Sequence, residues 1–180
     1  MSAVTAIPAG SYVIDPTHSR IGFSARHAVI TKVRGSFNDF AGTGSIADGQ
    51  VSLEVVMQAD SIDTRQADRD AHLKSEDFFN AAAFPQLKFV STSVTQTGAD
   101  EFAVTGELTI KDVTKPLTIE FEYTGAATDP FGNKRVGLEG EAEINRTDFG
   151  LVWNAVLETG GVLVSDKIKL EFEISAIVQA

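Results

Sequence analysis

Apolar and polar residues alternate with a period of two along several stretches of this chain. In residues 102–110, for example, the apolar residues occupy every second position. The same pattern recurs in residues 51–57, 117–123, 138–144 and 167–174. Because successive side chains of a strand point to opposite faces, each stretch predicts a strand with one buried face and one solvated face. The chain is therefore predicted to be all-β, with eight antiparallel strands that close into a barrel when the last strand meets the first strands.

Short polar segments and glycines separate these strands. The Asp48 and Gly49 dipeptide predicts a two-residue hairpin turn. Residues 35–42 begin and end with glycine and predict a bulged strand. Residues 1–11 predict a loose N-terminal tail, so that the single predicted domain spans residues 1–180.

Small residues interrupt the apolar face of two predicted strands. Gly106 lies among large apolar residues on the apolar face of residues 102–110. Gly140 and Ala142 lie among large apolar residues on the apolar face of residues 138–144. The interior of an eight-stranded barrel is either filled by side chains or holds one small ligand. Small inner residues fit both cases, since they either alternate with large ones to fill a tapering interior or leave space for a ligand. We expect the second arrangement.

One segment departs from the alternation. Residues 63–79 are rich in helix formers and predict a short helical insertion around residues 64–80. Asp63 or Thr64 is the expected N-cap, with Gln66 three residues after Asp63 in the capping-box position.

Composition and charge exclude several classes of function. The net charge of −10 argues against a nucleic-acid surface, which needs clustered Lys and Arg, and against simple electrostatic docking on anionic lipid. Cysteine is absent, so disulfides and thiolate metal sites are excluded. No stretch approaches the roughly 18 apolar residues of a membrane helix, and the N-terminus lacks the basic region of a signal peptide. We therefore expect no integral membrane segment and a cytoplasmic location.

Candidate catalytic chemistry is sparse. His18, His27 and His72 do not have the spacing of metal ligands, which predicts that the protein binds no metal. The GxSxG, Walker A and GxGxxG motifs are absent, so no nucleotide cofactor and no catalytic residue are predicted.

The polar run NRTDFG at residues 145–150 follows a regular strand and has two interpretations. It is either a structural turn, in which Arg146 and Asp148 pair or bind backbone, or a polar rim that holds the head group of a ligand. Trp153, the single tryptophan, either packs at the rim or lines a pocket.

An ordered set of short motifs resembles one protein family, the YceI-like family, from about residue 11 to residue 177. The motifs are residues 12–19 (YVIDPTHS), 23–27 (FSARH), 33–37 (VRGSF), 59–64 (ADSIDT), 69–73 (RDAHL), 77–79 (DFF), 84–85 (FP), 106–110 (GELTI), 114–116 (TKP) and 145–150 (NRTDFG). The resemblance implies a lipocalin-like fold, an eight-stranded antiparallel barrel with a helical insertion. It also implies a binding protein whose lumen takes a long amphiphile, such as a polyisoprenoid, an isoprenoid-quinone precursor or a fatty amide.

The combined expectation is a non-enzymatic protein that carries or stores such a lipid in the barrel, with no cofactor and no metal. The expected ligand-binding residues are inner-face residues, aromatic residues of the helical side, and rim residues. They are Phe23, His27, Phe37, Phe40, Phe78, Phe79, Phe84, Phe89, Leu108, Phe121, Leu138, Ala142, Arg146, Asp148, Trp153 and Phe172.

The sequence is also compatible with two alternatives: an enzyme or isomerase acting on a similar lipid, and a structural or stress protein with a packed barrel. An inward carboxylate or histidine with a strongly shifted pKa favours the first alternative, and a solid lumen favours the second. The expected partner is a hydrophobic small molecule and not a nucleic acid. The sequence leaves the oligomeric state open, a homodimer included.

Overall fold

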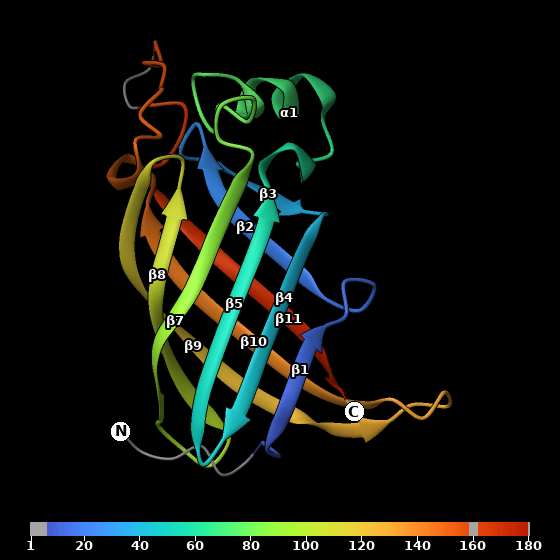
Figure 1. Ribbon diagram of the computed structural model, residues 1–180. Coiled ribbons are helices and arrows are strands. Elements are labelled where there is room, and N and C mark those ends of the chain that lie inside the picture. Colours follow the sequence, from blue (N-terminus) through green and yellow to red (C-terminus); the bar gives the residue numbers. More distant parts are fainter. Residues whose placement is uncertain (1–6, 159–161, 180) are drawn as a thin grey trace.

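The computed structural model describes residues 7–158 and 162–179, and eight of its strands form a closed antiparallel barrel (Figure 1). In their order around the barrel the strands are β1 (Gly10–Ile14), β4 (Phe40–Ala47), β5 (Gln50–Gln58), β7 (Gln86–Gln96), β8 (Glu101–Ile110), β9 (Val113–Thr128), β10 (Lys134–Asn145) and β11 (Lys167–Gln179). Pairing of β11 with β1 completes the circle. The predicted fold class is thereby confirmed.

Two strands share one edge of β11, and this arrangement closes the barrel. The last part of β11 pairs with β1, and its earlier part pairs with β2 (Arg20–His27). Between β1 and β2 the chain leaves the sheet in a turn that contains Pro16, which has no backbone N–H to donate. β3 (Thr31–Phe37) pairs with β2 and with the short β6 (Ile62–Asp63), so that the wall extends at the helical end of the barrel.

The hairpin predicted at Asp48 and Gly49 is confirmed. Ala47 pairs with Gln50, and the two residues between them have φ angles of +52° and +75°. Positive φ at both central residues gives the type I′ turn, whose twist matches that of the flanking strands.

Residues 35–42 form a corner, so the prediction of one bulged strand there is wrong. β3 ends at Phe37, β4 begins at Phe40, and the two strands pair with different neighbours. The backbone N–H of Asn38 donates to the carbonyl of Ser61 at 3.2 Å, which ties the corner to the 3₁₀ turn η1 (Ala59–Ser61).

The expectation of a loose tail is wrong from residue 7 onward. Ile7 is buried, and the Tyr12 hydroxyl donates to the carbonyl of Pro8 at 2.6 Å. β1 itself begins at Gly10. Residues 1–6 of the predicted tail lie outside the described residues.

The helical insertion is confirmed, but its cap differs from the expected one. α1 (Ala67–Lys74) has Gln66 as its N-cap, and the Gln66 side chain accepts a hydrogen bond from the backbone N–H of Arg69. Asp63 cannot cap the helix because β6 holds it against β3, where its carboxylate accepts from the Arg65 N–H at 2.8 Å.

Aromatic rings fill the space beside the inner glycines, which corrects the expectation that these small residues hollow the lumen. A Cβ atom on Gly140 would lie 2.5 Å from Cδ1 of Phe121, its direct partner across the β9–β10 pair. A Cβ atom on Gly106 would lie 2.5 Å from Cζ of Phe89 and 2.4 Å from the carbonyl oxygen of Val90. Each glycine therefore allows a phenylalanine of the neighbouring strand to lie against the sheet.

We predict that Gly140→Val destabilises the barrel by about 1–3 kcal/mol, because the new side chain collides with the Phe121 ring. Urea unfolding measures the effect. Glu139→Val, one residue away on the exposed outer face, serves as the control and should change stability by less than about 0.5 kcal/mol. Equal effects of the two substitutions would contradict the close approach of ring and backbone.

An ion-pair network links the turn after β1 to the β9–β10 hairpin on the outside of the barrel. Arg135 donates to Asp15 at 2.6 Å and to Asp129 at 2.8 Å. Hydrogen bonds from Arg135, His18 and Thr17 hold the pKa of Asp15 well below its usual range. Burial raises the pKa of Asp129, but hydrogen bonds, chiefly from Arg135, outweigh it and lower that pKa to about 2. Both carboxylates therefore favour the folded state only while they are ionised.

Arg135→Met should lower the stability of the fold at neutral pH and make that stability less dependent on pH in the acidic range. A carboxylate with a depressed pKa stabilises the fold above its unfolded pKa of about 4, and this contribution is lost as the pH falls through the folded pKa. The urea midpoints of parent and variant should therefore differ most at about pH 7 and converge between about pH 5 and pH 2. Lys134→Met, which alters an exposed neighbouring cation, is the control. A difference that stays constant down to about pH 2 would contradict this assignment.

Candidate ligand cavity

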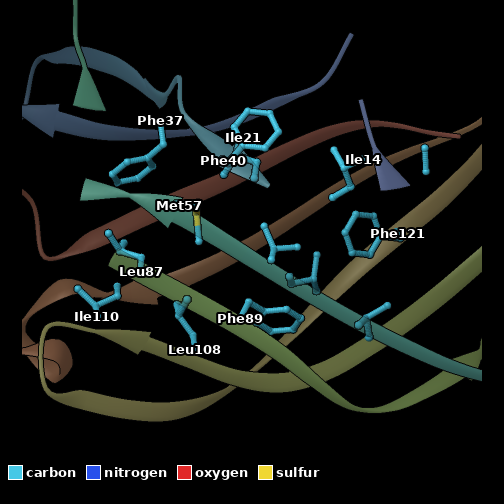
Figure 2. Close-up of a cluster of buried hydrophobic side chains, with 14 of the residues drawn as sticks. Ile14, Ile21, Phe37, Phe40, Met57, Leu87, Phe89, Leu108, Ile110 and Phe121 are labelled. Atoms are coloured by element: carbon cyan, nitrogen blue, oxygen red, sulfur yellow. The ribbon is translucent and has the colours of Figure 1, made fainter. Parts of the chain in front are cut away.

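The barrel encloses an apolar cavity of about 250 Å³. Side chains from every barrel strand line the cavity, and most of those labelled in Figure 2 are among them. A dry cavity of about 150 Å³ with Leu, Ile and Phe walls is known to bind benzene. The space inside this barrel is therefore large enough for an apolar ligand group.

Most of the expected ligand-binding residues lie on the cavity wall. They are Phe23, Phe37, Phe78, Phe79, Phe89, Leu108, Phe121, Leu138, Arg146 and Phe172. Three of their aromatic rings form a chain of contacts, because the ring centroid of Phe37 lies 5.7 Å from that of Phe79 and 5.8 Å from that of Phe23. Their contact with a ligand stays a prediction.

Three of the other expected residues belong to the interior or border it but do not line the cavity. Phe40 is buried in the core at the start of β4. Ala142 is half-buried and packs against the core, and Phe84 is half-buried after the helical segment. The structure does not place these three residues on the cavity wall, and their contact with a ligand stays a prediction.

His27 is exposed, which contradicts its expected inward position. Asp148 is exposed as well, and its contact with a ligand head group stays a prediction. His27 has the same strand parity as Phe23, but the β2–β3 hairpin continues past the barrel wall. There the backbone of His27 forms an isolated antiparallel β-bridge with Val164. Asp148 lies in the 3₁₀ turn η2 (Arg146–Phe149) and points to solvent.

Of the two interpretations of Trp153, packing at the rim and lining a pocket, the structure supports packing. Its ring centroid lies 4.5 Å from that of His72 and 5.5 Å from that of Phe78. This contact joins the helical segment to the segment that follows η2. Trp153 does not line the cavity itself.

Arg146 is a buried structural residue, and its guanidinium is not available to a ligand head group. It donates at 2.5–3.3 Å to the carbonyls of Leu151, Trp153, Val164 and Ser165 and to the carboxylate of Asp166. These bonds engage all five donors of a guanidinium. Burial lowers the pKa of Arg146, and Asp166 partly offsets the effect. The interpretation of NRTDFG as a structural turn is therefore correct, with Asp166 as the ionic partner in place of Asp148.

Several cavity residues were not among the expected set. Tyr12 and Leu53 lie on regular strands, where the alternation itself places them inward. Leu73 belongs to α1, while Leu151 and Val164 follow η2, outside the barrel strands. No periodic pattern of residues identifies Leu151 and Val164. Hydrogen bonds from Arg146 to their backbone carbonyls, and not strand alternation, position this segment.

Within residues 7–158 and 162–179, no helix is long and apolar enough to cross a membrane. The same residues contain no group of three or more His, Cys, Asp or Glu side chains that could hold a metal ion.

A closed eight-stranded barrel around an apolar cavity is the lipocalin-like class of architecture. Within this class, the chain belongs to the YceI-like family, because the model of the YceI-like domain matches residues 12–176.

Individual relatives agree with this assignment. The chain is 40% identical over 180 residues to a UPF0312 protein of Shewanella denitrificans, with 97% of this chain and 91% of the relative covered. It is 26% identical to a Campylobacter jejuni YCEI protein of known structure, with a TM-score of 0.74 over 86% of this chain and 90% of that one. A polyisoprenoid binding domain from Saccharophagus degradans shares the fold, with a TM-score of 0.73 at 14% identity, and 96% of this chain and 100% of that chain are covered.

Replacing Arg146 with Leu should destabilise the protein by about 3 kcal/mol or more, because several carbonyls lose their donor at once. Arg146→Lys should restore only part of this loss, since an ammonium has three donors and no planar fork. Urea unfolding and limited proteolysis of the segment after η2 measure the effect. Asp148→Asn, on the exposed side of the same turn, should change stability by less than about 0.5 kcal/mol. A stable Arg146→Leu protein would contradict the structural role.

Proposed function

We propose that this protein binds one long apolar ligand inside the barrel and carries or stores it. The apolar cavity is the observation that supports this function. Ligand pockets are mostly apolar with few polar groups, and each methylene that moves from water into such a site contributes roughly 0.8 kcal/mol. The same cavity speaks against the packed-barrel alternative, which needs a filled lumen.

The lining also favours binding over catalysis. Tyr12 and Arg146 are the titratable side chains among the described residues that line the cavity, and both donate to backbone carbonyls of the protein. Burial, and to a lesser extent Tyr123, raises the pKa of Tyr12, which keeps its hydroxyl protonated. A general acid or base works best with a pKa near the working pH. The shift of the Tyr12 pKa leads away from neutrality, and a guanidinium stays protonated in proteins.

For the ligand class we propose a polyisoprenoid, such as an isoprenoid-quinone precursor, or a fatty-amide-like lipid of similar shape. The apolar wall suits an unbranched or prenyl chain in either case. The structural likeness to a protein described as a polyisoprenoid binding domain favours the prenyl chain.

Leu53→Trp tests the location of the ligand, because Leu53 lines the cavity and is only half-buried. The larger ring should occupy ligand space and weaken binding of an added long-chain prenol at least about tenfold, a change of about 1.4 kcal/mol. Fluorescence competition or equilibrium dialysis with the delipidated protein measures the affinity.

Glu54→Trp, on the outer face one residue away, is the matched control and should leave prenol affinity unchanged. Urea unfolding of both variants shows whether they remain folded. Absence of binding by the parent protein across prenols, quinones and fatty amides would overturn the proposal. Equal loss of affinity in both variants would place the ligand outside the cavity.

A further inference from the structure

The β2–β3 hairpin is cationic in a strongly anionic molecule. The net charge of the chain is −10, yet residues 19–38 contain four Arg or Lys residues and no Asp or Glu. Arg20 lies 3.5 Å from Glu171. Arg26, Lys32 and Arg34 are exposed and form no ion pair with any described residue. The hairpin therefore has a positively charged surface, although the net charge of the whole chain is negative.

The register of the hairpin places these cations side by side. Arg26 is the direct partner of Lys32, and Arg34, the partner of Ser24, is the next outward residue on β3. Like charges directly opposite each other on a strand pair are destabilising. A carboxylate at one of these positions would stabilise the hairpin, so folding alone does not account for the arrangement.

The tip of the same hairpin is apolar and conformationally strained. Ala28 and Val29 have φ angles of +52° and +66°, and Val29 and Ile30 are 70% and 80% exposed. Turns with positive φ at both central residues prefer Asn and Gly, and a β-branched residue in this region is an outlier. The tip thus exposes aliphatic side chains at positions where polar residues would suit the backbone better.

A second segment widens this surface. The N–H of Ala28 donates to the carbonyl of Leu163 at 2.8 Å. In the segment that contains Leu163, Val156 forms an isolated β-bridge with Val162, and Val152, Val156 and Val162 are exposed. We call Val29, Ile30, Val152, Val156 and Val162 the apolar tip surface. Apart from Val13 and Phe131, it contains every exposed large apolar side chain of the described residues.

The apolar tip surface borders the cavity wall. Leu151 precedes Val152 in the chain and Val164 follows Leu163, and both Leu151 and Val164 line the cavity. Two acidic residues of this segment are exposed, Glu158 and Asp166, and Asp166 pairs with Arg146. The side of the barrel nearest the hairpin tip therefore combines aliphatic side chains with a row of cations.

We propose that the apolar tip surface docks on an anionic lipid bilayer. Aliphatic side chains would enter the boundary between head groups and acyl chains, while Arg26 and Lys32 contact lipid phosphates. This surface suits an anionic bilayer because it places exposed aliphatic side chains next to cations that form no ion pair with a described residue. The proposal rests on the proposed function in one respect, since a lipid cargo gives the protein a reason to visit a membrane.

Flotation with large unilamellar vesicles tests the proposal. The parent protein should bind phosphatidylglycerol–phosphatidylcholine vesicles at least about tenfold more strongly than pure phosphatidylcholine vesicles, and added salt should weaken the binding. Lys32→Glu should reduce binding to the anionic vesicles about fivefold or more. Ile30→Ser should reduce it with little change in melting temperature. Val29→Gly should reduce vesicle binding and also raise the melting temperature, because glycine relieves the strained turn.

Matched controls lie at the β9–β10 hairpin, at the opposite side of the barrel (Figure 1). Lys134→Glu makes the same charge change, and Phe131→Ser removes a side chain that is 89% exposed. Both controls should leave vesicle binding unchanged. Equal losses in the controls and the hairpin variants, or no preference for anionic vesicles, would overturn the docking surface.

Prenol affinity of the same variants in vesicle-free solution separates this proposal from the proposed function. Prenol binding without vesicle binding would overturn the docking surface and leave the proposed function intact. Vesicle binding that depends on Lys32 and Ile30, in a protein that binds no prenol, would support the docking surface and overturn the proposed function. Specific capture of an acidic protein by the hairpin, with no affinity for anionic vesicles, would overturn the membrane as the partner.

Discussion

The pairing of one strand, β11, with both β1 and β2 is the constraint on which the rest of the structure depends. It converts an open sheet into a closed barrel, and closure gives every barrel strand an inner face, which in this protein is lined mainly by apolar side chains. The same pairing directs β2 away from β1 and past the wall, so that the β2–β3 hairpin protrudes. The cavity and the exposed hairpin are therefore two consequences of the same strand arrangement.

A second interaction organises the helical end. The buried guanidinium of Arg146 holds four carbonyls of the segment after η2 in place. Trp153 on that segment then packs against His72 and Phe78 of the helical insertion. Polar bonds fix the backbone and aromatic contacts join the two covering segments, while the lining itself stays apolar. Burial of one well-bonded charge at the edge is compatible with an apolar interior.

The alternation of apolar and polar residues predicts those features of the structure that depend only on residues close together in the sequence. It correctly places Phe102, Val104 and Leu108 inside, and the Asp-Gly pair at the first hairpin. It fails for His27, because the parity of a strand does not show where the barrel wall ends. It also misjudges Gly140, because the ring that fills the space belongs to Phe121 on the neighbouring strand. The bonds of Arg146 reach residues as far as 20 positions away, which local pattern cannot detect.

Native mass spectrometry of the freshly purified protein shows whether the barrel holds one apolar ligand. We expect a species heavier than the bare chain by the mass of one lipid, which disappears on delipidation and returns when a long-chain prenol is added. A single bare-chain mass before delipidation and after incubation with prenols, quinones and fatty amides would overturn ligand binding inside the barrel.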